Sequence, residues 1–145
     1  MGLAERYREY AQAFEDAYAD DDWSRLEAYF TEDAIYDGGE GPDAVARGRG
    51  AVLERLKGGV DAFDRRFDAR KLRFVDEPKE ESGRVRVELA LECTKSGLPP
   101  CTMTCTETAR FEGDRIAELR DEFDGATLAA LDSWLSEHGS FLQDE

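Results

Sequence analysis

One carboxylate interrupts the most apolar strand face that the sequence predicts. Residues 101–111 alternate in polarity, and one face of this segment consists of Cys101, Met103, Cys105, Glu107, Ala109 and Phe111. A buried carboxylate is costly unless it is paired, protonated or beside water. Glu107 is therefore either part of a pocket wall, or a residue that reaches solvent at the rim or forms a hydrogen bond on the helix side. The first interpretation makes it a candidate for proton transfer.

A second carboxylate has two possible orientations. Alternation over residues 115–123 places Ala117, Leu119, Asp121 and Phe123 on one face. The other face consists of Ile116, Glu118, Arg120 and Glu122. The first face has two large apolar residues against one, which favours an inward Asp121. If Ile116 marks the inside instead, Asp121 is exposed. Met103 and Leu119 share the inner faces with the two carboxylates and are the expected apolar contacts of a ligand.

The elements that would position these residues follow from periodicity and from turn signals. Apolar steps of three and four predict helices over residues 3–20, 23–30, 49–67 and 126–138, with Asp124 as the cap of the last one. Strands are expected at 33–37, 71–75, 84–94, 101–111 and 115–123. Gly and Pro content predicts a loop over 38–42, and the tail 139–145 is expected to be loose. We find no repeat or linker, so residues 1–145 are predicted to form one domain.

The two longest strands form a hairpin whose faces differ in character. If the turn is centred on Gly97, the apolar rows of both strands lie on the same side. The back then presents a row of threonines at positions 102, 104, 106 and 108 beside mixed charge. This flat surface of low charge predicts a homodimer. No Lys or Arg lies on the inner faces of the hairpin, which favours a neutral or cationic ligand.

Charge and cysteine content indicate which classes of partner and which cellular compartment to expect. The formal net charge is −15, from 34 acidic and 19 basic residues. Such a surface repels phosphates and anionic lipids, so we expect neither nucleic acid nor membrane partners. The acidic excess fits either a salty cytoplasm or an ordinary acidic protein with an Arg-favouring genome. The sequence has three cysteines without a CxxC motif, one histidine and no secretory signal. We therefore expect a cytoplasmic protein without metal or cofactor.

The order of segments resembles a known superfamily. The resemblance covers nearly the whole chain and rests on an ordered set of weak motifs: a short helix beginning at Trp23, YFTEDAIY at 29–36, GR at 48–49, EGDRI at 112–116 and RDEFD at 120–124. This set is similar to the nuclear transport factor 2-like superfamily, especially its SnoaL-like and ketosteroid isomerase-like members. The resemblance implies an α+β fold: a cone-shaped, curved antiparallel sheet wrapped around three N-terminal and central helices, plus a C-terminal helix.

The resemblance also implies candidate site residues. Ketosteroid isomerases carry a Tyr on the first helix and an Asp on the first strand, and the matching positions here look like Phe14 and Gly38. Their second pocket acid resembles Glu107. The inner-facing first strand of the family makes Tyr36 a pocket candidate, whereas Tyr18 is either a pocket or a core residue.

Limonene epoxide hydrolase-like members add a further comparison. They carry a strand Tyr, an Arg-x-Asp pair and an Asp before the last helix. Tyr36 and Asp121 resemble the first and last of these, whereas Arg86 and Glu88 resemble the pair but fall on the Thr-rich back. Epoxide hydrolysis is therefore disfavoured, unless a one-residue bulge moves Arg86 and Glu88 to the other face.

Two classes of function remain open at this point. The first is a cofactor-free enzyme that acts on a small, largely apolar ligand, with Glu107 or Asp121 transferring protons and Tyr36 orienting the substrate. Its pocket would also use Phe14, Tyr18, Met103 and Leu119. The second is a non-catalytic ligand-binding or dimerisation module, because fold resemblance does not fix the reaction.

Overall fold

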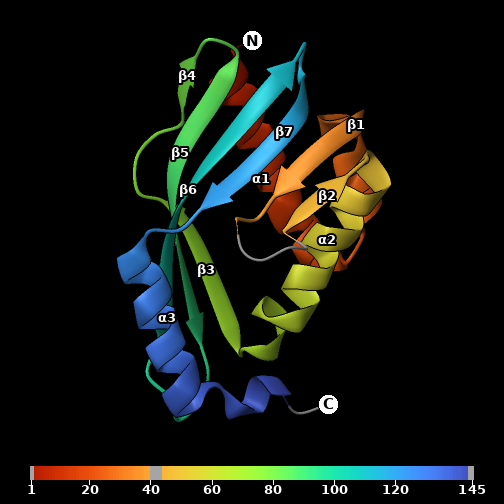
Figure 1. Cartoon of the computed structure of the whole chain (residues 1–145). Coiled ribbons are helices and arrows are strands. Elements are labelled where there is room, and N and C mark those ends of the chain that lie inside the picture. The colour runs from red at the N-terminus through yellow and green to blue at the C-terminus, as the bar shows by residue number, and fades with distance from the viewer. Residues whose placement is uncertain (1, 40–43, 144–145) are drawn as a thin grey trace.

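The chain folds into a curved sheet that wraps around two long helices (Figure 1). The computed structural model describes residues 2–39 and 44–143. Its helices are α1 (Leu3–Asp20), η1 (Trp23–Tyr29), α2 (Arg49–Ala62), η2 (Asp64–Arg66), α3 (Gly125–His138) and η3 (Gly139–Gln143). Its strands are β1 (Phe30–Asp37), β2 (Val45–Arg47), β3 (Ala69–Phe74), β4 (Lys79–Glu81), β5 (Arg84–Thr94), β6 (Cys101–Glu112) and β7 (Arg115–Glu122). The predicted α+β class is confirmed.

The sheet follows the order β2-β1-β7-β6-β5-β3, and β4 pairs with the first three residues of β5. One pairing differs from the prediction of an antiparallel sheet, because β1 runs parallel to β7. The strands β2 and β4 were not predicted. Each has three residues, which is too short for alternation to be visible in the sequence.

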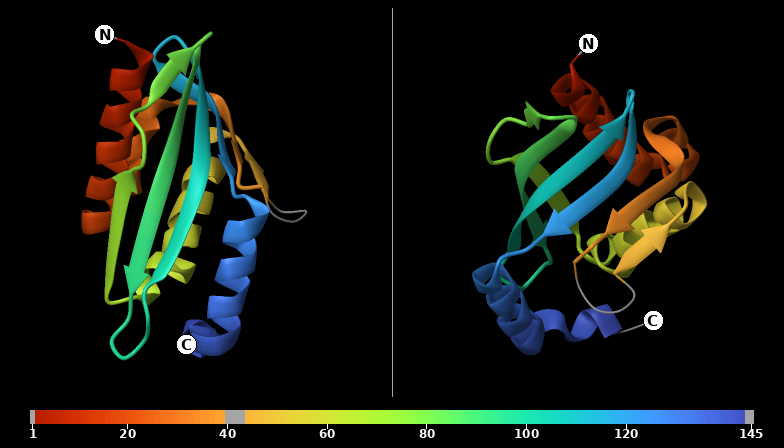
Figure 2. Two further views of the ribbon diagram at one scale, coloured as in Figure 1. Left: turned by 90° about the vertical axis from the view of Figure 1, so that its left-hand side faces the viewer. Right: turned by 45° about the horizontal axis from the view of Figure 1, so that its top comes forward.

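Helix α1 lies along the concave side of the sheet, and its bounds match the prediction (Figure 2). It buries Tyr7, Tyr10, Ala13 and Ala17, which are spaced by three and four residues. These side chains join the main core with residues of α2, β5, β6 and β7. The helical stripe therefore covers the same sheet face that carries the apolar rows of the hairpin.

Helix α2 is shorter than predicted. It begins after Gly48, whose φ of 94° is a conformation that favours glycine and turns the chain from β2 into the helix. It ends at Ala62, and a 3-10 turn over Asp64–Arg66 leads into β3. The consecutive helix glycines Gly58 and Gly59 cost about 1 kcal/mol each relative to alanine and weaken the continuation to residue 67.

The β5–β6 hairpin has the predicted register. Cys93 pairs with Cys101 and Val87 with Glu107, so the two apolar rows share the concave face. The β6–β7 pair contains a bulge, because Arg110 pairs with Glu118 whereas Phe111 pairs with Ile116. The extra residue is Ala117. This bulge puts Ile116 and Leu119 both inside, although they have opposite parity, and so resolves the ambiguity of the last strand.

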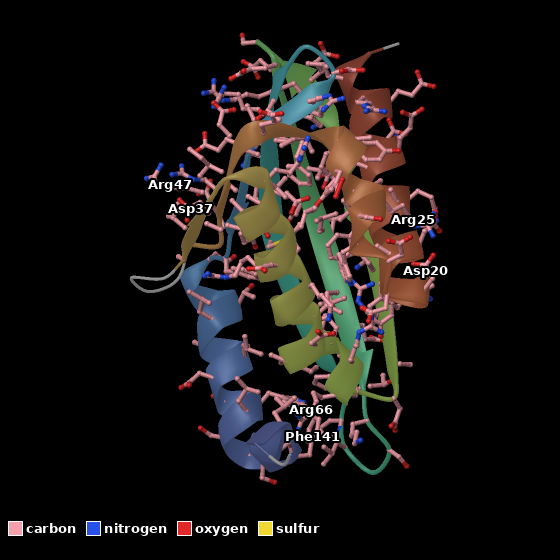
Figure 3. The ribbon with its side chains drawn as sticks, turned by 90° about the vertical axis from the view of Figure 1, so that its right-hand side faces the viewer. Asp20, Arg25, Asp37, Arg47, Arg66 and Phe141 are labelled. Atoms are coloured by element: carbon pink, nitrogen blue, oxygen red, sulfur yellow. The ribbon has the colours of Figure 1, made fainter. Side chains whose placement is uncertain are left out.

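The C-terminal segment closes the lower end of the structure. Asp124 caps α3 as predicted, since its carboxylate accepts a 2.7 Å hydrogen bond from the backbone N–H of Thr127. The tail is not loose over residues 139–143, where η3 brings Phe141 to 5.2 Å from the ring of Phe67. Figure 3 shows Phe141 beside Arg66, which donates a 3.0 Å hydrogen bond to the Phe141 carbonyl oxygen.

Two expectations concern regions that need separate mention. Residues 40–42 of the predicted loop and residues 144–145 of the tail lie outside the described part of the chain. Within the part that is described, no helix is long and apolar enough to cross a membrane.

Candidate functional site: a carboxyl pair in an apolar cavity

A cavity of about 340 Å³ lies between the helices and the concave face of the sheet. Its walls come from α1, α2 and strands β3, β5 and β6, and most of the side chains in them are apolar. Leu72 and Phe74 of β3 face Leu89 and Leu91 of β5 in the register of that strand pair. The volume is within the range of small-molecule sites.

Two carboxyl groups lie side by side in the cavity wall. Glu107 of β6 and Asp121 of β7 are direct cross-strand partners, and both line the cavity. Glu107 is only 8% exposed, although its neighbours on this strand face are mostly apolar. The face argument from the sequence therefore located a real exception to the apolar interior.

Each carboxyl group is held by a tyrosine from a different element. The Tyr7 hydroxyl of α1 donates a short hydrogen bond to Glu107 Oε1. The Tyr36 hydroxyl of β1 donates to Asp121 Oδ2 at 2.6 Å. Helix α1 and strand β1 thus each hold one carboxyl group of the pair in place. A preorganised site requires side chains that are fixed in this way.

The environment favours a proton on Glu107. Burial raises its pKa well above the ordinary value, and the charge of Asp121 and a hydrogen bond to it raise the pKa further. The hydrogen bond from Tyr7 acts in the opposite direction but does not offset these effects. Asp121 Oδ1 is buried and has no donor among the described residues, which a protonated Glu107 would supply. The environment therefore favours a protonated Glu107 at this position.

Two further polar side chains face the same space. Tyr10 lines the cavity, and burial together with the charges of Glu107 and Asp121 raises its hydroxyl pKa. Cys105 also lines it, and burial followed by the same two carboxylates raises the pKa of its thiol. The thiol therefore stays protonated and is a poor nucleophile. Both groups are therefore neutral beside the carboxyl pair.

A buried ion cluster forms another part of the wall. The Arg70 guanidinium, whose side chain is 5% exposed, donates to Glu15 Oε1 at 2.6 Å and to Asp64 Oδ2 at 2.7 Å. Burial raises the pKa of Asp64, although the charge and hydrogen bond of Arg70 lower it. This cluster links α1, η2 and β3. The positive charge of Arg70 is therefore already matched within the protein.

The structure brings most of the predicted site residues to this cavity, but not all. Phe14, Tyr36, Met103, Glu107 and Asp121 lie in its wall. Leu119 does not, because it is fully buried in the main core. Tyr18 does not either.

The ring of Tyr18 has other neighbours. It packs against the guanidinium groups of Arg65 at 4.8 Å and Arg70 at 4.7 Å. The core alternative for this residue therefore describes its surroundings better.

Tyr7 and Tyr10 are the site residues that sequence reasoning missed. The position of Phe14 was matched to the helix tyrosine of ketosteroid isomerases, whereas the structure places the hydroxyl of Tyr7 on Glu107. The signal was present, since both tyrosines belong to the apolar stripe of the first helix. Their distance to the carboxylate depends on how the helix is rotated over the sheet, which the stripe does not specify.

The partner of Asp121 also differs from the Arg-x-Asp match. Glu88 pairs with Thr106 and thus lies on the outer face, as the alternation predicted. Glu107 is the carboxyl group that faces Asp121, and Cys105 occupies the position two residues before it. The Arg-x-Asp pattern is therefore not present at Cys105–Glu107, because a cysteine stands where the pattern has an arginine. Among the residues described, no cluster of three or more His, Cys, Asp or Glu side chains is arranged to hold a metal ion.

A curved sheet around α1 and α2 with an enclosed cavity defines the nuclear transport factor 2-like fold. Within this class, a sequence profile described as the SnoaL-like domain matches residues 11–119. The chain therefore belongs to the SnoaL-like domain family. No curated protein sequence matches it significantly.

Several solved structures share the fold at low sequence identity. One is TerC co-crystallised with polyporic acid, at 17% identity and a TM-score of 0.65 over 88% of this chain and 98% of that one. A limonene epoxide hydrolase-like enzyme from M. tuberculosis is 16% identical, with a TM-score of 0.62 over 88% and 90%. A ketosteroid isomerase-like protein from Catenulispora acidiphila in complex with trimethylamine is 18% identical, with a TM-score of 0.64 over 89% and 95%. These similarities concern the fold alone.

Proposed function

We propose that the cavity binds a small, largely apolar molecule and that the Glu107–Asp121 pair exchanges a proton with it, without a cofactor. The observation that carries the proposal is a buried carboxyl pair, held by two tyrosines, in an otherwise apolar wall. A neutral Glu107 donates a proton or a hydrogen bond to an oxygen of the ligand. Asp121 accepts a proton from a carbon or from a water beside it.

This division of roles fits isomerase, cyclase and hydrolase chemistry. All three need an acid and a base whose protonation states differ at the same pH, and two adjacent carboxyl groups provide this because they cannot both ionise at low cost. Among the fold relatives, an epoxide hydrolase-like enzyme is one example of a catalyst. Tyr36 and Tyr7 act as positioning residues, because each holds one carboxyl group and neither needs to react.

A model ketone tests the proton-exchange step without knowledge of the natural substrate. The probe is 2-tetralone in D₂O, and the measurement is the rate of deuterium incorporation at its activated α-carbon by NMR. We expect the wild-type protein to accelerate exchange, and both Asp121→Asn and Glu107→Gln to lose about 100-fold or more. Tyr18→Phe is the control, because Tyr18 is outside the cavity wall. Exchange no faster than in buffer would contradict the catalytic part of the proposal.

Binding without chemistry is the second candidate. It is favoured by the fact that each carboxyl group already accepts a hydrogen bond from a tyrosine. The position that resembles the base of ketosteroid isomerases is also a glycine, Gly38. Native mass spectrometry of the purified protein distinguishes the two candidates when combined with the exchange assay. A retained small molecule together with absent exchange favours the binding module.

We also propose that the chain forms a homodimer through the outer face of the sheet. The motive is the threonine row of β6, whose own side chains are uncharged in a strongly acidic protein, although charged residues of β5 and β7 pair with it. One end of this row is occupied by α3, since the hydroxyl oxygens of Thr104 and Thr127 are 3.1 Å apart. The central residues Thr106 and Thr108 are thus the expected contact. Sedimentation of wild type and Thr106→Arg at micromolar concentration tests this, and a monomeric wild type would contradict it.

A location in a reducing cytoplasm completes the proposal. The three cysteines are free thiols, including the cross-strand neighbours Cys93 and Cys101. An odd number of cysteines without a CxxC motif fits a reducing compartment. The net charge of −15 supports a small molecule, and neither nucleic acid nor an anionic membrane, as the partner.

A further inference from the structure

Arg55 of α2 is a second charged feature of the cavity wall. The hairpin alone suggested a preference for neutral or cationic ligands, because its inner faces lack Lys and Arg. The structure adds Arg55 and Arg70 to the wall from elements outside the hairpin. Arg70 is matched by Glu15 and Asp64, but Arg55 is not matched by any carboxylate in the described part of the chain.

The helix itself explains why no carboxylate of the described residues lies beside Arg55. Side chains three and four residues apart are neighbours on a helix surface. The positions at these distances from Arg55 are Ala51, Val52, Gly58 and Gly59, none of which is acidic. Of the two arginines in the cavity wall, only Arg70 is paired with carboxylates among the described residues.

The space beside Arg55 is also open. Gly59 lies one turn further along α2 and lines the same cavity. A Cβ atom placed on Gly58 or on Gly59 would meet no heavy atom within 4 Å. Both glycines are exposed, so this space opens to solvent as well as to the cavity. The unmatched cation and this free space are adjacent on one helix face.

We infer that the ligand of this cavity is an amphipathic carboxylic acid whose carboxylate is bound by Arg55. This inference rests on the proposed ligand-binding function and specifies its substrate class. The apolar body of the ligand contacts the Leu and Phe walls, and a polar group at its other end lies beside Glu107 and Asp121. The guanidinium of Arg55 presents a planar fork of N–H donors that matches a carboxylate. Arg55 is thus a specificity-determining residue.

A pair of probes of equal shape tests the inference. The probes are 4-phenylbutanoate and its neutral amide, 4-phenylbutanamide, and their dissociation constants are measured by isothermal titration calorimetry at low salt. We expect the wild-type protein to bind the carboxylate about fivefold to tenfold more tightly than the amide, because charge-assisted hydrogen bonds are the stronger ones. Arg55→Gln should remove this preference and change the affinity for the amide less than about twofold.

Arg73→Gln is the matched control. Arg73 is exposed in β3 and outside the cavity wall, and its replacement changes the net charge by the same amount. It should behave as the wild type, which separates a local contact from the general repulsion of anions by an acidic protein. A second readout is the NMR signal of the Arg55 side-chain Nε–H, which should shift with the carboxylate and stay in place with the amide.

The outcomes separate the two proposals. Equal affinity of the wild type for both probes, or a preference that survives Arg55→Gln, overturns the role of Arg55 and leaves the proposed binding function intact. Binding of neither probe at about 10 mM overturns both, since an accessible apolar cavity should hold such a molecule at least weakly. If Glu107→Gln loses binding of the amide while Arg55→Gln still removes the preference for the carboxylate, both proposals are supported.

Discussion

Glu107 occupies a position where its charge is costly. It is buried beside Asp121, and the only donor that reaches it among the described residues is Tyr7. A raised carboxyl pKa means that the folded state binds a proton more tightly than the unfolded chain. Stability therefore falls as the pH rises through the unfolded value towards the folded one, and the loss is present in full above the folded value.

Glu107→Gln removes this loss, and the variant should be more stable than the wild type at neutral pH. The amide keeps an oxygen for the Tyr7 hydroxyl and offers an N–H to Asp121, as a protonated Glu107 does. The expected gain exceeds the 0.5 kcal/mol or so that surface substitutions produce, and it should vanish near pH 4. Urea denaturation at the two pH values measures it, with Glu92→Gln on the exposed side of β5 as the control. An unchanged stability at neutral pH would place Glu107 in a wet environment.

Tyr36 should contribute to stability through its single hydrogen bond. Tyr36→Phe leaves Asp121 Oδ2 without its 2.6 Å donor, so we expect a loss of about 1–3 kcal/mol. Tyr18→Phe removes the same hydroxyl group from a ring outside the cavity and should cost less than about 0.5 kcal/mol. Equal losses for the two variants, measured by thermal denaturation, would contradict a special role of the Tyr36 hydroxyl.

At the residue scale, the sequence predicted the carboxyl pair better than its partners. Glu107 is recognisable because strand parity fixes which side chains share a face. Asp121 stayed ambiguous because a bulge at Ala117 changes the parity within β7, and nothing in the segment marks it. Tyr7 was missed because the distance from a helix residue to a strand residue depends on tertiary packing.

At the scale of elements, the Arg70 cluster connects three parts of the chain that are distant in sequence. Arg70 of β3 is paired with Glu15 of α1 and with Asp64 of η2. Glu15 Oε2 is also buried and lacks a donor among the described residues. The cluster therefore fixes the lower end of α1 against the sheet only as long as the cation is present.

Arg70→Met should destabilise the protein by about 3 kcal/mol at neutral pH, because it leaves the largely buried Asp64 carboxylate without its cation. Without Arg70, the pKa of Asp64 is raised further, so the deficit should grow between pH 4 and pH 7 and shrink in acid. Arg25→Met is the control, because the Arg25–Asp20 pair is exposed and should contribute less than about 1 kcal/mol. A deficit that does not depend on pH would indicate lost packing instead.

Long elements were predictable and short ones were not. The bounds of α1 and of β5 follow from apolar periodicity over many residues, and the symmetric turn around Gly97 fixed the hairpin register. The early end of α2 and the 3-10 conformation of η3 depend on contacts such as Phe141 on Phe67. Contacts of this kind join residues far apart in the chain and leave no local pattern.

At the scale of the whole molecule, the excess of acidic residues opposes folding. A net charge of −15 on 145 residues produces self-repulsion in the compact state. Many of the ion pairs that act against it are exposed, as in the pairs of Lys57 and Arg65 with Asp61. Such pairs contribute little and are screened by salt as well. The repulsion should therefore dominate the response of stability to ionic strength.

Raising KCl from about 20 mM to about 500 mM should increase the melting temperature by a few degrees, which corresponds to about 1 kcal/mol for a chain of this length. The Debye length falls to about 3 Å at 1 M, so pure screening must level off there. A plateau below 1 M identifies an ordinary acidic protein, whereas a rise that continues to several molar identifies adaptation to a salty cytoplasm. Choline chloride serves as the control, because screening does not depend on the identity of the cation. A melting temperature that stays flat or falls over the first 500 mM would show that the ion pairs outweigh the repulsion.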